Sequence, residues 1–266
     1  MEIRIGCTGW AYSAWQGTFY PKTIKQKDWL AHYSSIFEIT EVNSSFYRIP
    51  TKQMTAKWNV DTPSDFRFSL KFPKSITHEA KLDYDKCKDE LTRFFSGLEP
   101  LKSKISVLLF QLPHSLTFKE TKPRLEILKN HLPHYCRFAI EGRNDSWFTP
   151  DAINYLKENR FCLVWSEVPM VENTAPITTD FVYVRLIGDR ELPDDVYDHT
   201  VRDQSKVIGK WVDRIRKLDD SRVDFVFALS NNHLEGFSPA TSNSLRKMLG
   251  LEKKEFRDKK QKSIFD

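Results

Sequence analysis

The sequence has few cysteines, few glycines and no long apolar run, and each shortage excludes a class of protein. Its four cysteines, Cys7, Cys87, Cys136 and Cys162, are far apart and form no Cys-x-x-Cys pair. This argues against a disulfide framework or a zinc knuckle and favours a reducing cytoplasm. The nine glycines form neither GxGxxG nor GxxxxGK[ST], so the usual phosphate-binding loops are absent. No apolar run approaches the ~20 residues that span a bilayer, and the first residues lack a secretory signal pattern. We therefore expect a cytoplasmic protein without a membrane partner.

What remains is the composition of a globular protein. Of 266 residues, 40% are hydrophobic and 29% are charged, which excludes a disordered chain. This length corresponds to one large domain or two small ones. The formal net charge of +5 permits an anionic partner but does not require one.

Short runs rich in β-branched and aromatic residues alternate with segments of helical periodicity. This alternation predicts a parallel sheet, and the chain length fits a single α/β domain with a (β/α)8 TIM-type barrel of ~250 residues. A doubly wound open sheet is the alternative. Residues 166–180 contain Pro169 and Pro176 and lack an apolar stripe, so we expect the sixth helix to be missing or degenerate. The predicted strands are Ile3–Thr8, Phe37–Asn43, Phe66–Phe72, Ile105–Leu112, Arg137–Glu141, Phe161–Trp165, Phe181–Leu186 and Val223–Leu229.

We assign residues 1–250 to the barrel domain and residues 251–266 to a charged, mobile C-terminal tail. The long, acid-rich segment 188–204 is interpreted as a loop over the barrel mouth. No internal repeat and no linker divides the chain.

The alternation of side chains along each strand predicts which polar groups face the barrel interior. In residues 66–71 the bulky side chains share one face, and Ser69 and Lys71 share the other. In residues 138–141, Ala139 and Glu141 lie opposite Phe138 and Ile140. Because the helix layer should take the large apolar groups, Lys71 and Glu141 are expected to point inward. The same counting adds Glu41, Asn43, Gln111, Trp165, Arg185 and Asn231 at the C-terminal strand ends.

These strand ends form the rim where barrel enzymes keep their active sites. With Arg143 and Glu167 added, the rim combines carboxylates with Lys and Arg side chains. Such a set can supply general acid–base chemistry and hold an anion. We assign Glu141 and Glu41 as acid and base, and Lys71 and Arg185 as charge-stabilising groups. Asn43, Gln111 and Asn231 would orient the ligand. The alternative is a structural ion-pair network that closes the barrel.

Aromatic and histidine residues follow the same strands. Trp10 and Tyr47 could stack on sugars or bases, or close the mouth by packing. His78 could carry protons, or simply bond within its loop. A divalent cation on Glu41, Glu141 and Glu167 with His78 or His233 is a further alternative, although nothing in the spacing requires one. His131, His134 and Cys136 match no standard zinc spacing.

The motifs at these positions resemble the YecE-like family, also called domain of unknown function 72. The resemblance covers almost the whole chain and implies a TIM-barrel fold, but it supplies no reaction because the family is largely uncharacterised. Likeness of such folds to endonuclease IV and xylose-isomerase-type barrels suggests nucleic-acid binding as an alternative function. The stretches that carry it are residues 5–10, 15–21, 41–47, 66–71, 76–78 and 111–113, Glu141 to Arg143, Trp147, Trp165, Arg185, and Asn231, Asn232 and His233.

The end of the chain carries a second resemblance. Gln261, Ile264 and Phe265 are similar to the start of a sliding-clamp-binding box, in which an aliphatic residue follows a glutamine by three positions. A solvated charged tail is the alternative.

Taken together, the sequence predicts an enzyme of hydrolase, isomerase or lyase type with a small anionic or sugar-like ligand. The alternatives are a DNA- or RNA-binding barrel connected with repair, docked on a sliding clamp, and a non-catalytic scaffold.

Overall fold

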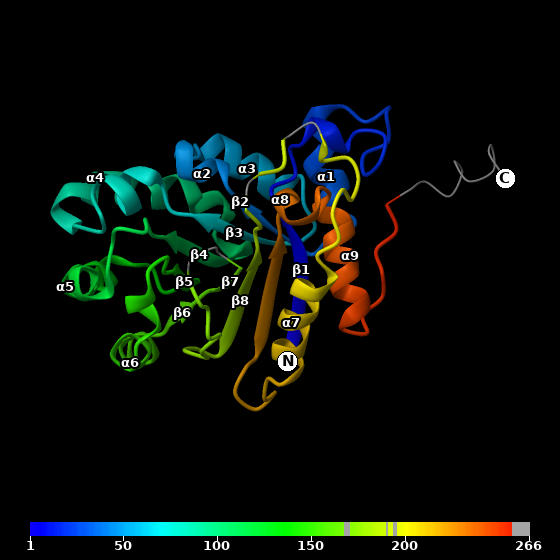
Figure 1. The fold of residues 1–266 in the computed structure, drawn as a ribbon. Helices are drawn as coiled ribbons and strands as arrows, with labels where there is room; N and C mark the ends of the chain where they lie inside the picture. The colour runs from blue at the N-terminus through cyan, green and yellow to red at the C-terminus, as the bar shows by residue number, and fades with distance from the viewer. Residues whose placement is uncertain (168–170, 190, 194–195, 257–266) are drawn as a thin grey trace.

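Nine parallel strands form a nearly closed barrel in the part of the chain that the structure describes (Figure 1). The structure is a computed structural model that describes residues 1–167, 171–189, 191–193 and 196–256. The strand order is β6-β5-β4-β3-β2-β1-β9-β8-β7, so neighbours in sequence are neighbours in space and the doubly wound alternative is wrong. The strands are β1 Glu2–Thr8, β2 Ile39–Val42, β3 Arg67–Lys71, β4 Ile105–Gln111, β5 Arg137–Glu141, β6 Phe161–Leu163, β7 Trp165–Ser166, β8 Phe181–Leu186 and β9 Phe225–Ser230.

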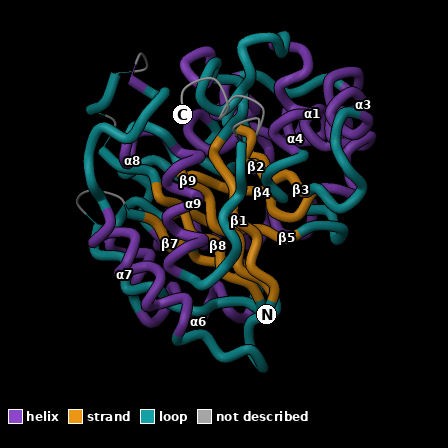
Figure 2. Tube along the Cα trace, turned by 90° about the vertical axis from the view of Figure 1, so that its right-hand side faces the viewer, coloured by secondary structure: helices purple, strands orange, loops and turns teal. Residues whose placement is uncertain are grey.

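Helices surround the strands, as the tube view shows (Figure 2). Several of them begin at side-chain caps: Thr117 and Glu120 form a capping box at α5, and Thr149 accepts from the Ala152 N–H at α6, with Pro150 in the first turn. No helix in the described ranges is both long enough and apolar enough to cross a bilayer. The helices are α1 Trp29–Ser34, α2 Ser44–Tyr47, α3 Lys52–Val60, α4 Tyr84–Leu98, α5 Phe118–Leu128, α6 Pro150–Glu158, α7 Ser205–Arg216, α8 Asn232–Glu235 and α9 Ser238–Met248.

Two apolar layers lie on opposite faces of the strands. The outer layer packs strands against helices; for example, the ring of Phe72, next to β3, lies 5.1 Å from that of Phe94 on α4. The inner layer is smaller and fills the barrel. Its members confirm the predicted alternation on most strands, because the same parity continues into the polar residues at the C-terminal ends. The inner layer consists of Ile39, Val107, Leu109, Ala139, Cys162, Val164, Phe181, Tyr183, Phe227 and Leu229.

The barrel is irregular where β6 and β7 meet. β6 pairs with β5, β7 pairs with β8, and only Val164 separates the two short strands. Residues 171–180, which follow, contain no helix, as expected for the missing sixth helix. This segment is held by polar contacts instead: Asn173 Nδ2 donates to the Val164 carbonyl at 2.9 Å, and Thr178 Oγ1 donates to the Phe161 carbonyl at 2.8 Å.

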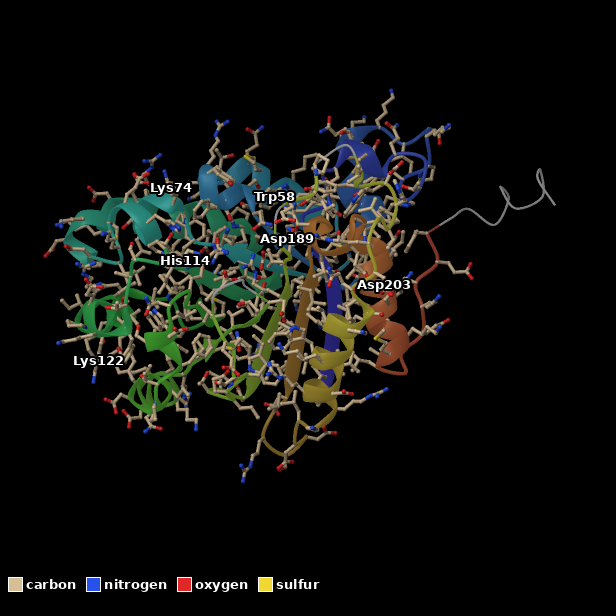
Figure 3. The ribbon with its side chains drawn as sticks, in the orientation of Figure 1. Trp58, Lys74, His114, Lys122, Asp189 and Asp203 are labelled. Carbon is tan, nitrogen blue, oxygen red and sulfur yellow. The ribbon has the colours of Figure 1, made fainter. Side chains whose placement is uncertain are left out.

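Two further segments pack on the barrel: the described part of residues 188–204 lies at the C-terminal ends of β1 and β9, and residues 251–256 follow α9. In the described part of the 188–204 loop, Arg202 pairs with Asp189 and its Nε donates to the Leu234 carbonyl of α8 (Asp189 is labelled in Figure 3). After α9, Arg246 Nε donates to the Glu252 carbonyl, and Phe256 packs on Phe19 with ring centroids 5.2 Å apart. Residues 251–256 therefore lie against the barrel. The predicted partner-binding residues Gln261, Ile264 and Phe265 lie outside the described residues.

Candidate functional site

An ion-pair cluster lies inside the barrel at the C-terminal ends of the strands. Arg185 at the end of β8 lies between two carboxylates: its Nε and Nη2 donate to the Oε2 and Oε1 atoms of Glu41, at 2.9 and 2.7 Å. Its Nη1 donates to Glu141 Oε2. Glu41 and Glu141 are fully buried and Arg185 is 2% exposed. The structure therefore brings together three of the four residues that the sequence suggested for catalysis, each from a different strand.

The fourth residue, Lys71, joins this cluster through an amide. Gln111 Nε2 donates to Glu141 Oε1 at 2.9 Å, and Lys71 Nζ donates to Gln111 Oε1 at 2.6 Å. Among the described residues, no carboxylate lies within ion-pair distance of Lys71. A lysine that is only 5% exposed thus has a neutral hydrogen-bond acceptor in place of a counter-ion. We call Glu41, Lys71, Gln111, Glu141, Arg143 and Arg185 the mouth cluster.

The sequence interpretation did not assign a role to the hydroxyl groups below this cluster. The Tyr183 hydroxyl lies 2.8 Å from Glu41 Oε2 and 2.6 Å from Ser69 Oγ. Since a hydroxyl has one hydrogen and a carboxylate is the stronger acceptor, Tyr183 donates to Glu41. Both residues share the inward parity of Arg185 and Lys71, which is the signal that could have identified them.

The electrostatics distinguish Lys71 from its neighbours. Burial would raise the pKa of Glu141, but Arg185 and Arg143 outweigh it and hold that pKa well below its ordinary value. Burial would lower the pKa of Arg185, but Glu141 and Glu41 raise it instead. For Lys71, burial followed by the charge of Arg185 lowers the pKa to about 7. At neutral pH the Glu141 carboxylate and the Arg185 guanidinium keep their charges, whereas the Lys71 amine is populated in both its protonated and its neutral form.

Helix α2 covers Lys71. Ser45 Oγ contacts the carbonyl oxygens of Val42 and Lys71, at 2.9 and 2.7 Å, and so ties α2 to the ends of β2 and β3. The Phe46 ring then lies 4.3 Å from Lys71 Nζ, close enough for a cation–π contact when the amine is charged. The His78 ring meets Phe46 edge-on at 5.0 Å. Partial burial and the charges of Lys71 and Arg143 lower the pKa of His78.

The turn after β5 positions Arg143. A Cβ on Gly142 would lie 2.3 Å from Trp147 Cγ, so only glycine lets this buried indole pack across the strand end. Trp147 Nε1 donates to the Leu116 carbonyl, which fixes the ring. Arg143 is then directed back, and its Nε donates to Glu141 Oε1 at 2.7 Å, while 15% of its side chain remains exposed.

Two hollows flank α2 at this end of the barrel. One, of about 190 Å³, is lined by Trp10 and Asn43. The other, of about 500 Å³, is lined by Phe46, Tyr47 and Lys74 (Lys74 is labelled in Figure 3). Trp10 packs edge-on against Trp58 at 5.5 Å, and Tyr47 is 80% exposed. These predicted ligand-binding residues therefore surround the mouth cluster without touching its charges.

Asn231, Asn232 and His233 form a separate group at the start of α8. Asn231 Nδ2 donates to Thr8 Oγ1, and its Oδ1 caps the His233 N–H. Asn232 Oδ1 accepts from Trp15 Nε1 and from the Ser238 N–H. His233 contacts the Tyr197 hydroxyl. These contacts connect β9 to the loops around it.

The expected inward direction of Trp165 and Glu167 is wrong. Trp165 packs outward against Trp211 of α7, and its Nε1 donates to the Pro176 carbonyl. Glu167 Oε2 accepts from Trp211 Nε1 at 2.8 Å. On this strand the small Cys162 and Val164 face the interior, so the bulky residues turn to the helix layer, where there is room for them.

The arrangement also bears on the metal alternative. Glu41 and Glu141 share Arg185, whereas Glu167 and His233 lie in other groups. Within the described ranges, no set of three or more His, Cys, Asp or Glu side chains has a geometry that could hold a metal ion.

Comparison with known proteins agrees with this architecture. Residues 4–264 match the family model described as "Protein of unknown function DUF72". The UPF0759 protein YecE of Escherichia coli is 30% identical over 146 residues, which are 55% of this chain and 50% of YecE. The UPF0759 protein YunF of Bacillus subtilis is 32% identical over 152 residues, 56% of this chain and 53% of YunF. The chain thus spans about half the length of the curated relatives it matches.

Solved structures share the fold over nearly the whole chain. A DUF72 family protein from Thermotoga maritima superposes with a TM-score of 0.79 at 25% identity and covers 94% of this chain and 100% of its own. One from Enterococcus faecalis has a TM-score of 0.77 at 23% identity, with 97% and 98% covered. The nearly closed parallel barrel and the match over residues 4–264 lead to one conclusion: this chain belongs to the DUF72 family.

Proposed function

We propose that the barrel mouth is the site of an enzyme that binds a small anionic ligand and uses Lys71 for proton transfer. The observation that carries this proposal is the position of the Lys71 amine: it is buried at a strand end, it has a neutral amide as its hydrogen-bond acceptor, and it lies under an aromatic ring. An acid–base catalyst works best with a pKa near the working pH, and burial places that of Lys71 at about 7.

The carboxylates fit a positioning role better than the acid–base role that the sequence suggested. Glu41 accepts from Arg185 and Tyr183, and Glu141 accepts from Arg185, Arg143 and Gln111. Hydrogen bonds to the charged form make a carboxylate a weak base. In this proposal they hold Arg185 and Gln111 in place, and Gln111 in turn orients the Lys71 amine.

The charge of the cluster favours an anion. Arg143 and Arg185 balance Glu41 and Glu141, so a protonated Lys71 leaves one positive charge in excess. The partly exposed Arg143 and His78 lie on the solvent side of the same group. An oxyanion placed there would receive charge-assisted hydrogen bonds, and the hollows beside α2 could take the rest of a sugar-like molecule.

We further interpret β6 and β7 as one strand interrupted at Val164. With that interpretation, eight strand positions surround the axis, as in a (β/α)8 barrel that lacks its sixth helix. We retain residues 1–250 as the barrel domain. Nucleic-acid binding and clamp docking stay predictions from the sequence.

The first experiment measures the titration of the lysines directly. Reductive ¹³C-methylation followed by NMR resolves individual lysines, and Lys71→Met identifies the signal of interest. We expect one methylated lysine, absent from that variant, to titrate near pH 7. A Lys71 signal that titrates near 10 would contradict the proposal.

The second experiment tests ligand binding with glucose 6-phosphate, inorganic phosphate and glucose as probes. We expect the phosphate-bearing probes to bind and Lys71→Met to weaken them at least tenfold, whereas Lys88→Met leaves binding unchanged. Equal binding of these probes by both variants would show that the anion site lies elsewhere.

A further inference from the structure

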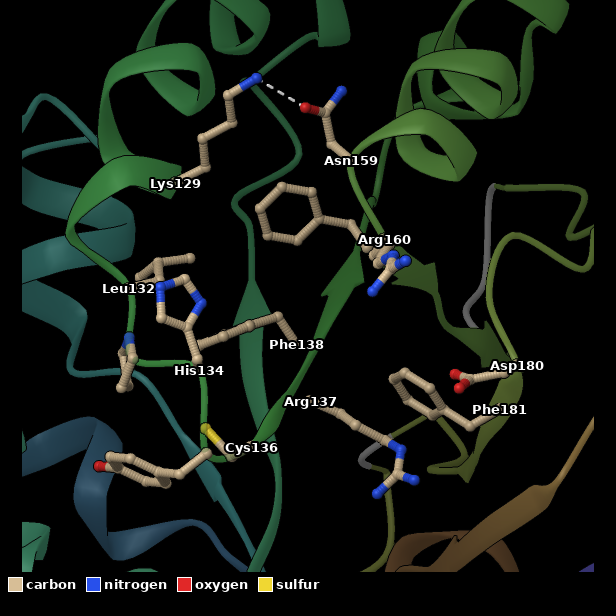
Figure 4. A pocket seen from close by; sticks show the side chains of 13 residues that line it. Lys129, Leu132, His134, Cys136, Arg137, Phe138, Asn159, Arg160, Asp180 and Phe181 are labelled. Carbon is tan, nitrogen blue, oxygen red and sulfur yellow. Dashed lines mark hydrogen bonds between the residues drawn. The ribbon is translucent and has the colours of Figure 1, made fainter.

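A third hollow lies at the opposite end of the barrel, far from the mouth cluster. It has a volume of about 580 Å³ and is lined by the first residues of three strands, Arg137, Phe161 and Phe181. Residues 132–136 form one side, and Arg160, Asp180 and Phe181 form the other, with Arg137 and Phe138 between them (Figure 4). A volume of this size is within the range of small-molecule sites, about 300–1,000 Å³.

One of the two arginines that line this hollow, Arg137, has no acid partner among the described residues. Arg137 shares the inward parity of Ala139 and Glu141 on β5, and its guanidinium lies 4.4 Å from the Phe225 ring and 5.7 Å from the Phe181 ring. In the described part of the chain, Arg137 makes neither an ion pair nor a side-chain hydrogen bond. Stacking on a ring uses the face of the guanidinium and leaves its N–H edge available for two parallel hydrogen bonds to an oxyanion.

Arg160 adds a second cation in a strained position. It follows α6 with a φ of 56°, in the left-handed region where a helix usually ends with glycine. Its side chain, like that of Arg137, has no ion pair or hydrogen bond among the described residues. Glycine would adopt this φ without strain, so the position can be changed to glycine to remove the side chain while keeping the backbone conformation.

The other lining groups select the rest of the ligand. Lys129 is already paired with Glu126 at 2.7 Å and with Asn159 at 2.6 Å, so it supports the wall. Asp180 is the acid in the lining, which leaves the two free arginines in excess by one positive charge. The partly exposed ring of Phe138 supplies a surface against which a planar ring can pack, whereas Phe161 and Phe181 are 2% exposed and form the base of the hollow.

We propose that this hollow binds an anion that carries a planar ring, of the size and chemistry of a nucleoside monophosphate. Arg137 and Arg160 hold the oxyanion, and Phe138 contacts the ring. This site is independent of the mouth cluster, because none of its lining residues belongs to that cluster.

Calorimetric titration of the full chain tests the proposal, with AMP as the probe and adenosine and inorganic phosphate as its two halves. We expect saturable AMP binding that exceeds the binding of either half, and at least a tenfold loss in both Arg137→Gln and Arg160→Gly. Arg160→Gly is the sharper variant, because glycine relieves the strained φ and should raise Tm while it weakens binding. Lys88→Met, an exposed position on α4, should leave AMP affinity unchanged. The same titrations in the Lys71→Met background separate binding at this hollow from phosphate binding at the mouth.

Three outcomes would overturn the proposal. They are no saturable binding of AMP at millimolar concentration, AMP binding that persists in both arginine variants, and AMP binding that is lost in Lys71→Met but kept in Arg160→Gly. The last result would place the nucleotide at the mouth, so a failure of this inference is distinguishable from a failure of the proposed enzyme site.

Discussion

Each end of the barrel holds an arginine that faces the interior, and the two arginines have opposite charge environments. At the C-terminal end, Arg185 is 2% exposed and bonded to both Glu41 and Glu141. At the N-terminal end, Arg137 is partly exposed and packs on Phe181 and Phe225 without an acid partner. The charge of Arg185 is neutralised by carboxylates of the protein, whereas the charge of Arg137 is available to solvent or to a ligand.

This difference separates the stabilising role of a buried charge from its binding role. A guanidinium that donates to two buried carboxylates, as Arg185 does, mainly holds those carboxylates in place, since a ligand would have to displace them. A guanidinium whose N–H groups have no acceptor in the protein contributes little to folding stability, but it can donate hydrogen bonds to an oxyanion. In the mouth cluster, the cation available to bind an anion is Lys71 rather than Arg185, because the hydrogen-bond acceptor of Lys71 is a neutral amide.

The largest expected effect comes from Arg185→Met. It removes the guanidinium that pairs with two fully buried carboxylates, and leaves Glu41 with the Tyr183 hydroxyl and Glu141 with Arg143 and Gln111. This loss should reduce the free energy of unfolding by about 3–5 kcal/mol. Arg137→Met should cost less than about 1 kcal/mol, because no buried acid is orphaned. Urea unfolding of the two variants measures the contrast. Adding Glu41→Gln and Glu141→Gln to Arg185→Met should recover part of the loss, and similar costs at the two ends would break the comparison.

Lys71→Met should act in the opposite direction at neutral and acid pH. Because the folded pKa of about 7 lies below the unfolded value, the unfolded chain binds more protons between these two values. Wild-type stability should therefore rise with pH from about 7 to about 10. The variant lacks this slope and should be more stable by roughly 1–3 kcal/mol near pH 6, with the gain shrinking toward pH 10. Urea midpoints across pH give the answer, and parallel profiles for the two proteins would contradict it.

Arg160→Gly sharpens the comparison at the N-terminal end. Replacing a residue with a φ of 56° by glycine should stabilise the fold by up to about 1 kcal/mol. Thermal unfolding measures this gain. A loss of stability would mean that the Arg160 side chain stabilises the fold. Its charge would then have a structural role, as that of Arg185 has at the mouth.

Glu167→Gln should have the smallest effect. The amide oxygen can still accept from Trp211 Nε1, and the ion pair with Lys210, at 3.7 Å, is solvent-exposed. The expected change is below about 0.5 kcal/mol, with binding of phosphate-bearing probes at the mouth unaltered. Measurable weakening of that binding would mean that Glu167 takes part in the site at the barrel mouth, as the sequence interpretation had suggested.

The sequence predicted the barrel well where strand and helix patterns are regular. The strands at residues 137–141 and 181–186 begin and end as expected, and the alternation on β3 and β5 directed Lys71 and Glu141 inward. It failed at residues 161–166, where apolar side chains occupy both faces and parity alone does not say which face is inside. There the packing decided: the narrow interior takes Cys162 and Val164, and Trp165 meets α7.

The partners within the site could not be predicted in the same way. Which carboxylate meets Arg185, and that Gln111 stands between Lys71 and Glu141, depends on the register between strands. Pairing of Gln111 with Glu141 across β4 and β5 is a property of the closed sheet rather than of either strand. The sequence identified the charged groups of the site, and the geometry determines which of them gains or loses a proton near neutral pH.

The pairing of the first strand with the last, from Glu2 beside Phe225 to Cys7 beside Ser230, has a consequence for biosynthesis. While the ribosome is making the chain, β1 can pair with β2 as soon as β2 has been synthesised, but it cannot pair with β9 until residues 225–230 have emerged. During that interval β1 keeps an unpaired edge, and unpaired strand edges favour aggregation.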